Sequence, residues 1–361
     1  MPQAAQKSGA NGPSPKLEIS ASRQFNAWLA EQGASIAFTT YQSGKLFLLG
    51  LQPDGRLSFF LRSFDRATGL WASPDARTLF LATLFQLWRF DDALQPGQDH
   101  QGCDRLYVPQ IGCTTGDLDV HDVTFDRKGR IVFVNTRFSC LATVSETHSF
   151  VPLWRPPFIS SLAAEDRCHL NGVALQDGEV AFVTALARSD LVDGWRGRRA
   201  DGGVIVDVRN NDVVVEGLSM PHSPRWYDGR LWLMESGTGW FGYADLSRGR
   251  FERVAFCPGY ARGLTFHGNL AIIGLSKPRA NRAFAGLALE SEFAAQKAVP
   301  RCGLLAVDLG TGEAQQWLRV EGVIEELYEV AVLAGTRRPM AIGLMTDEIH
   351  RVFTIDEPEP L

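Results

Sequence analysis

The feature that most constrains the fold of this chain is a β pattern that recurs seven times, at intervals of about 45 residues. Each unit has a strand, a polar turn and then a strongly apolar strand. The first strands of the units cover residues 37–41, 69–72, 121–125, 171–175, 222–226, 262–266 and 328–333. This spacing is typical of propeller blades, whose neighbours bury both faces of each sheet. We therefore predict an all-β protein, a β-propeller with seven blades preferred and six possible.

The two ends of the chain are predicted to close this ring. The last strand, residues 351–355, would join an early strand at residues 16–20 in one blade, which would hide the sheet edges. Residues 1–16 are rich in Ala, Gln, Ser, Pro and Gly, and are expected to be a disordered tail. Residues 17–361 are expected to form a single propeller domain, with helices only near residues 25–32 and 287–297.

Charge and hydropathy exclude several classes of partner. The net charge is −5 and the isoelectric point is near 5.9, so no basic surface favours nucleic acid. The sequence contains no apolar run near the roughly 18 residues that a membrane span needs. The N-terminal segment has no apolar signal-peptide core. We expect a cytoplasmic protein that binds neither nucleic acid nor membrane.

Several short motifs carry a family resemblance. The most specific is Pro221-His222-Ser223-Pro224-Arg225-Trp226, and others are His169-Leu170-Asn171-Gly172, Arg262-Gly263-Leu264 and Gly274-Leu275-Ser276-Lys277-Pro278-Arg279. Together they resemble a family of conserved hypothetical, mainly bacterial proteins that are sometimes joined to tetratricopeptide repeats. The resemblance runs from about residue 25 to the C-terminus. It implies one propeller-like domain and assigns no activity or catalytic residue.

Three histidines begin matching segments of the pattern, at His121, His169 and His222. Equivalent positions become neighbours when repeats are arranged radially, so these imidazoles are predicted to converge near the axis. Neutral imidazole is a ligand for transition metals, and three protein ligands leave an open position for water or substrate. We predict a divalent transition metal, Zn or Fe, bound by these three side chains. The alternative for each is a hydrogen-bonded structural histidine.

Other polar residues are predicted to gather on the same face. Inner strands begin where second strands end, because the two are antiparallel. This rule collects a candidate catalytic set and a candidate substrate-binding set: Glu235, Glu329 and Tyr328 in the first, and Arg225, Arg262, Asn171 and Lys277 in the second. Arginine would orient a carboxylate or phosphate through paired hydrogen bonds. The alternatives are a structural ion pair for Arg225 and a turn cap for Asn171.

Two long insertions, residues 185–203 and 277–301, should rise over this face as lids or partner-binding elements. The sequence therefore supports two functional hypotheses. The first is a metal-dependent enzyme that acts on a small anionic molecule or a peptide. The second is a non-catalytic scaffold that holds a peptide or protein partner.

Overall fold

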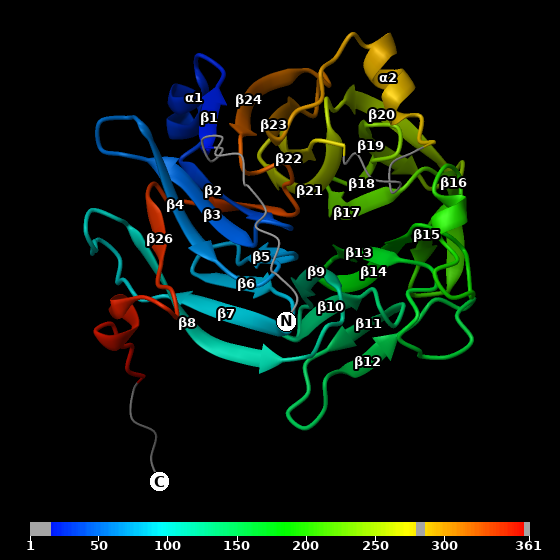
Figure 1. Ribbon diagram of the computed structural model, residues 1–361, viewed down its shortest axis with the longest axis horizontal. Coiled ribbons are helices and arrows are strands. Elements are labelled where there is room, and N and C mark those ends of the chain that lie inside the picture. Colours follow the sequence, from blue (N-terminus) through cyan, green and yellow to red (C-terminus); the bar gives the residue numbers. More distant parts are fainter. Residues whose placement is uncertain (1–15, 279–285, 357–361) are drawn as a thin grey trace, which may run out of the picture.

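The computed structural model describes residues 16–278 and 286–356 and forms a ring of six β-sheets (Figure 1). Each sheet is a blade with four antiparallel strands, and two blades carry a fifth. The six inner strands contact one another in order around the ring and so close it. The predicted β-propeller is confirmed, and its blade count is six, the smaller of the two numbers considered.

Each blade is built from its strands in order from the axis outwards. Blade 1 has β25 (Val330–Ala334), β2 (Ala34–Thr40), β3 (Lys45–Leu51) and β4 (Leu57–Ser63). Blade 2 has β5 (Leu70–Ala72), β6 (Thr78–Ala82), β7 (Gln86–Asp92), β8 (Arg105–Thr114) and β26 (Pro339–Ala341). Blade 3 has β9 (Val120–Phe125), β10 (Ile131–Asn135), β11 (Cys140–Thr143) and β12 (Val151–Trp154).

The other three blades follow in chain order. Blade 4 has β13 (Leu170–Gln176), β14 (Glu179–Ala185), β15 (Gly203–Asp207) and β16 (Asp212–Leu218). Blade 5 has β17 (Pro221–Tyr227), β18 (Arg230–Glu235), β19 (Trp240–Asp245) and β20 (Arg250–Phe256). Blade 6 has β21 (Tyr260–His267), β22 (Leu270–Ser276), β23 (Gly303–Asp308), β24 (Ala314–Glu321) and β1 (Glu18–Ala21).

The seventh unit of the sequence pattern has no blade of its own. Its first strand, β25, pairs antiparallel with β2 and becomes the inner strand of blade 1. Its second part contributes β26, which adds in parallel to β8 at the outer edge of blade 2. The first and last units therefore share one blade, which reduces seven units to six sheets and ties the two ends of the chain together.

The predicted pairing of residues 351–355 with residues 16–20 is wrong. Strand β1 pairs with β24 instead, with Glu18 opposite Glu321. Residues 351–355 are not a strand, and they follow a short 3-10 helix, Asp347–His350. The β25–β2 pairing already closes the ring, so the last segment has no strand edge left to complete. Residues 1–15 of the predicted tail lie outside the described residues.

Both predicted helices are present, as α1 (Phe25–Glu31) and α2 (Leu289–Ala295), and a second 3-10 helix covers Arg196–Arg198. Helix α1 buries Phe25, Trp28 and Leu29 against β2, β3 and β24 at the junction of blades 6 and 1. The helices are peripheral. No helix in residues 16–278 and 286–356 is long and apolar enough to cross a membrane.

Hydroxyl groups at the ends of second strands link successive blades. Thr136 donates to the carbonyl of Leu170 at 2.6 Å, and Ser236 donates to the carbonyl of Ala261 at the same distance. Two further bonds, Thr39 to Thr68 and Ser276 to Leu327, repeat the arrangement. Each acceptor lies at the beginning of the next inner strand or up to three residues before it. These bonds fix the beginnings of the inner strands, and therefore the residues that face the axis there.

Candidate functional site at one end of the axis

The residue after each linking carbonyl occupies one equivalent position per blade. The hydrogen bonds place Gly69, Asn171, Arg262 and Tyr328 there, and strand register adds His121 and His222. His121 and His222 are therefore equivalent, as the sequence pattern predicts. His169 is not, because it lies two residues before Asn171 and takes the place of Asp119 and Met220. His169, Asp119 and Met220 all have a left-handed backbone, with φ near 50°.

Five of these side chains are joined by ring contacts, and we call them the axial cluster: His121, His169, His222, Arg262 and Tyr328. The ring centroids of His121 and His169 are 4.7 Å apart, and those of His121 and Tyr328 are 5.5 Å apart. The Arg262 guanidinium carbon lies 5.1 Å from the Tyr328 ring and 5.0 Å from the Tyr260 ring. The Tyr260 ring in turn lies 5.6 Å from that of His222. Residues far apart in sequence thus meet at one end of the propeller.

The imidazoles of the axial cluster are held in the same tautomer. Nδ1 of His121 lies 2.8 Å from the carbonyl of Asp119, and Nδ1 of His222 lies 2.9 Å from the carbonyl of Met220. His169 has a carboxylate instead, with Nδ1 at 2.9 Å from Asp166. Because a carbonyl or carboxylate can only accept, we assign the proton to Nδ1 in each ring. Each Nε2 then carries a lone pair.

Burial determines the charges in the axial cluster. It lowers the pKa of His121 to about 4 and holds the pKa of His222 well below its usual value, so both rings are neutral at pH 7. Burial also raises the pKa of Tyr328 well above 10, which leaves a phenol that can donate a proton. Burial opposes the charge on Arg262, but Tyr260, Tyr328 and Glu326 outweigh it and raise the pKa. Arg262 therefore supplies the positive charge of the cluster.

Three buried polar atoms of the axial cluster have no hydrogen-bond partner within the described part of the chain. They are Nε2 of His222, the hydroxyl of Tyr328 and Nε of Arg262. His222 is 3% exposed and Tyr328 is 4% exposed, so bulk water does not solvate them. An unpaired buried polar group costs about 1–3 kcal/mol. Such groups are typical of binding sites, where a ligand completes the hydrogen bonds.

The two insertions meet beside the axial cluster. Trp195, from the first, lies 4.3 Å from the His169 ring and donates its indole N–H to Asp166 at 2.8 Å. Leu289 and Phe293, from the second, share a buried apolar cluster with Trp195 and Tyr260. The described parts of both insertions therefore lie at this end of the propeller, as predicted. In the first insertion, the arginines pair at the surface, for example Arg196 with Asp193 and Arg188 with Glu216. Arg279 and Arg282 of the second insertion lie outside the described residues.

One to three residues further along the chain in blades 1, 3 and 5 is a second polar group, the axial triad of Asp122, Arg225 and Glu329. Arg225 bonds both oxygens of Asp122, at 2.7 and 3.1 Å, and one oxygen of Glu329, at 3.2 Å. It also donates to the carbonyls of Val173 and Leu264, so all five of its N–H groups have acceptors. Burial, together with Asp122, raises the pKa of Glu329 to about 8. The structure places Arg225 and Glu329 in an internal brace between blades 1, 3 and 5.

Three other predicted site residues lie outside the axial cluster. Glu235 accepts hydrogen bonds from the N–H of Ser219 and the hydroxyl of Thr238, which fixes the turn after β18. Lys277 lies beside the buried thiol of Cys302 at the edge of blade 6. Asn171 joins blades 4 and 5, because its amide donates to the Pro221 carbonyl at 2.8 Å and accepts from Thr184 at 2.7 Å. This use of Asn171 is neither the ligand contact nor the turn cap that we considered.

Two residues that shape the site were missed by sequence reasoning. Asp166 lies before the strand and reaches His169 by a local turn, and no repeat marks that position. Tyr260 begins β21, two residues before Arg262, and its aromatic character is that of any core strand residue. The offset of His169 is a signal for Tyr260 alone, because it shows that the residue two places before the equivalent position also faces this end.

No group of three or more His, Cys, Asp or Glu side chains is arranged to hold a metal ion among residues 16–278 and 286–356. The edge-to-face packing of His121 against His169, with an interplanar angle of 84°, places the two rings in contact. In this arrangement the imidazoles of His121 and His169 pack against each other, and their Nδ1 atoms are hydrogen-bonded within the protein.

These features define a class: a six-bladed β-propeller whose axial end carries a buried histidine, arginine and tyrosine site. Within that class, residues 23–342 match the family described as a domain of unknown function (DUF4915), and the chain belongs to that family. This agrees with the resemblance to an uncharacterised conserved family. A search of curated protein sequences returns no match.

Solved structures agree on the fold. The chain is similar to one in the crystal structure of a nidogen/laminin complex, with a TM-score of 0.51, 12% identity, and 84% of this chain and 99% of that chain covered. It also matches virginiamycin B lyase from Staphylococcus aureus, inactive and with quinupristin, with a TM-score of 0.41, 10% identity and the same coverage. At these identities the likeness to the first concerns the fold alone, and the second carries no argument about function.

Proposed function

We propose that the axial cluster binds a small anionic molecule and forms the active site of an enzyme that acts on it. One observation carries this proposal: Arg262, Tyr328 and His222 each keep a buried polar atom without a partner in the described structure. Two of these atoms are donors, the hydroxyl of Tyr328 and Nε of the Arg262 guanidinium, and the third, Nε2 of His222, is an acceptor. A carboxylate or phosphate supplies the acceptors that such donors need, and a guanidinium is the side chain that suits both anions.

A small ligand fits this site better than a peptide. His121, His169 and His222 are each less than 10% exposed, and Trp195 packs on His169. A peptide would have to displace residues of both insertions and their buried apolar contacts. The alternative, a scaffold for a peptide or protein partner, therefore requires the insertions to open.

The chemistry open to the axial cluster is proton transfer beside an anchored anion. Arg262 would orient the anionic group, and the Tyr328 hydroxyl would donate a hydrogen bond to it. The Nε2 lone pairs of His121 and His222 would accept a proton from the bound molecule or from water. Because both imidazoles are neutral at pH 7, they are already in the form that a general base requires.

A metal-dependent reaction is the second candidate, favoured by the tautomer of the three histidines. Histidine ligands of metals almost always donate the other ring N–H to a carbonyl or carboxylate, and all three do so here. A divalent transition metal such as Zn or Fe would bind the Nε2 atoms of His121, His169 and His222. Binding would draw the rings together from their present packing, and would supply a Lewis acid next to Arg262.

The anion proposal is tested by calorimetric titration with malonate and with inorganic phosphate. We expect saturable binding of at least one of them, and at least a tenfold loss of affinity in Arg262→Gln. Arg230→Gln is the matched control, because Arg230 is an exposed arginine that stacks on Tyr243. No binding of either anion at millimolar concentration, or equal loss in both variants, would overturn the proposal.

The metal candidate is tested by elemental analysis of protein purified without added metal, followed by titration with Zn²⁺. Stoichiometric metal that is lost in His222→Ala and kept in His148→Ala, whose histidine is exposed, would support it. Metal-free protein that cannot be loaded would exclude it and would leave the anion proposal standing.

A further inference from the structure

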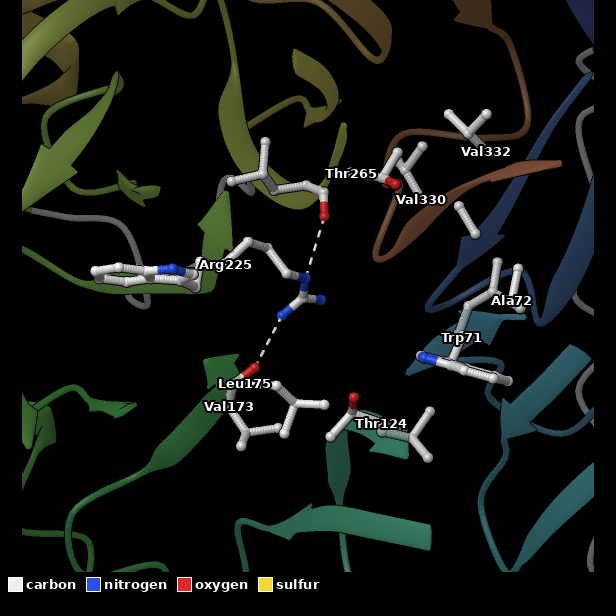
Figure 2. Close-up of a pocket in the computed structure, with 14 residues that line it drawn as sticks. Trp71, Ala72, Thr124, Val173, Leu175, Arg225, Thr265, Val330 and Val332 are labelled. Carbon is white, nitrogen blue, oxygen red and sulfur yellow. Dashed lines mark hydrogen bonds between the residues drawn. The ribbon is translucent and has the colours of Figure 1, made fainter. Parts of the chain in front are cut away.

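A cavity of about 250 Å³ opens at the other end of the axis, beyond the axial triad (Figure 2). All six inner strands line it, because each contributes the residues that follow its axial-cluster or triad position. Most of the lining side chains are aliphatic, for example Val173, Leu175 and Val332, with the indole of Trp71 at one side, while polar atoms supply the larger part of the exposed surface. Thr124 lies three positions beyond His121, which corresponds to about 10 Å along a strand. This axial pocket is therefore a different site from the axial cluster.

The charges around the axial pocket are already compensated. Arg225 is its one charged lining residue among those described, and all five N–H groups of that guanidinium have protein acceptors. Asp122 and Glu329 lie behind it, with side chains that are 1% and 3% exposed. A charged ligand would lose its hydration here without gaining a free counter-ion, at a cost of several kcal/mol. The pocket therefore selects against ions of either sign.

We propose that the axial pocket binds a small, uncharged molecule that contains an aromatic ring and a polar group. A cavity of roughly 150 Å³ lined by aliphatic side chains takes up benzene, so 250 Å³ fits a ligand of about ten heavy atoms. An aromatic ring gains the most binding energy next to Arg225, because the face of the ring attracts a guanidinium. The hydroxyls of Thr124 and Thr265 on the walls provide hydrogen bonds for one polar group.

Indole is a suitable probe, and indole-3-acetate is its charged counterpart. We expect ligand-observed NMR titration to show saturable binding of indole to the wild-type protein, at least tenfold tighter than indole-3-acetate. Thr265→Phe, which fills the pocket from blade 6, should weaken indole binding at least tenfold. Thr147→Phe is the matched control, because Thr147 is exposed in the loop before β12. The affinity of this variant for indole should stay within twofold of wild type.

Two further variants keep the test decisive. If Thr265→Phe does not fold, Thr124→Phe fills the same pocket from blade 3. Arg262→Gln should leave indole binding unchanged, so failure of the anion proposal and failure of this one are distinguishable. No saturable indole binding at millimolar concentration, equal binding of the anion, or indole binding that survives both filling variants would each overturn the proposal.

Discussion

The residues of the axial triad lie one to three positions beyond axial-cluster residues of the same blades, yet the two groups satisfy their polar atoms in opposite ways. His121 and Tyr328 belong to the cluster, while the next residues, Asp122 and Glu329, belong to the triad. In the triad, the five N–H groups of Arg225 all reach protein acceptors. In the cluster, three buried polar atoms reach none within the described residues.

The difference separates a structural polar group from a binding one. A buried ion pair is costly to assemble and very costly to break, so its members must be paired inside the protein. A single unpaired atom, as in neutral His222 and Tyr328 or at Nε of Arg262, costs less and remains available to a ligand. Sequence position alone does not distinguish the axial cluster from the axial triad, because both consist of polar residues near the start of strands that are otherwise apolar.

The largest expected effect comes from breaking the axial triad. Arg225→Met leaves the Asp122 carboxylate buried without a cation and the Glu329 carboxyl group without its donor, and should lower the free energy of unfolding by about 3–5 kcal/mol. Urea denaturation at pH 7 measures it. Arg230→Met, at an exposed arginine, should cost less than about 1 kcal/mol. A loss for Arg225→Met that is as small as the control would show that the triad does not brace the blades.

The propeller could be predicted from the sequence because its determinants are local. Apolar second strands bounded by Gly and Asp turns recur along the chain, and each marks a strand packed on both faces. The blade count could not be predicted, because it depends on whether β25 starts a sheet or completes one. That choice is decided by pairing with β2, about 300 residues earlier, and leaves no periodic signal.

A second test uses the pH dependence of the axial cluster. His121 has a pKa of about 4 in the folded protein and about 6.5 in the unfolded chain. The unfolded state therefore takes up a proton first as the pH falls, and stability is lost between about pH 6.5 and pH 4. This single group should cost about 2 kcal/mol on going from pH 7 to pH 5.

Urea denaturation at pH 7 and pH 5 in three proteins isolates that contribution. His121→Gln should lose about 2 kcal/mol less than wild type over this interval. His148→Gln, at an exposed histidine, should behave as wild type. Equal pH dependence in all three would mean that the His121 ring is solvated, and the contrast between the cluster and the triad would weaken.

The candidate site could be predicted only in part. Matching repeat positions identify His121, His222, Arg262 and Tyr328, because equivalent residues face the same end of the axis. The repeat pattern misplaces His169 by two residues, since its left-handed backbone brings an earlier position to that end. Nor does the pattern reveal that Arg225 is enclosed by acceptors, because Asp122 and Glu329 are more than 100 residues away in sequence.

A third test concerns Asn171, which occupies an axial-cluster position but is fully paired like the triad. Asn171→Leu removes its bonds to Pro221 and Thr184 and should cost about 2 kcal/mol in unfolding free energy. Asn26→Leu is the matched control, because Asn26 also donates to a carbonyl, that of Gly55, but at the surface. It should cost less than about 1 kcal/mol. Similar losses in the two variants would show that burial does not strengthen this interblade bridge.

The smallest expected effect sharpens the comparison at its boundary, where His169 contacts Asp166 and Trp195. Asp166 accepts hydrogen bonds from both of these side chains, and so satisfies its carboxylate as the triad does. Trp195→Phe keeps an aromatic ring against His169 but removes one donor, and should cost about 1 kcal/mol in urea denaturation because Asp166 is partly exposed. In Trp154→Phe, the indole N–H lost is bonded to the neutral amide of Asn211 at the surface, so the cost should be below about 0.5 kcal/mol. If the two losses are equal, the carboxylate gains nothing from the indole N–H, and Trp195 acts on the site only by covering the His169 ring.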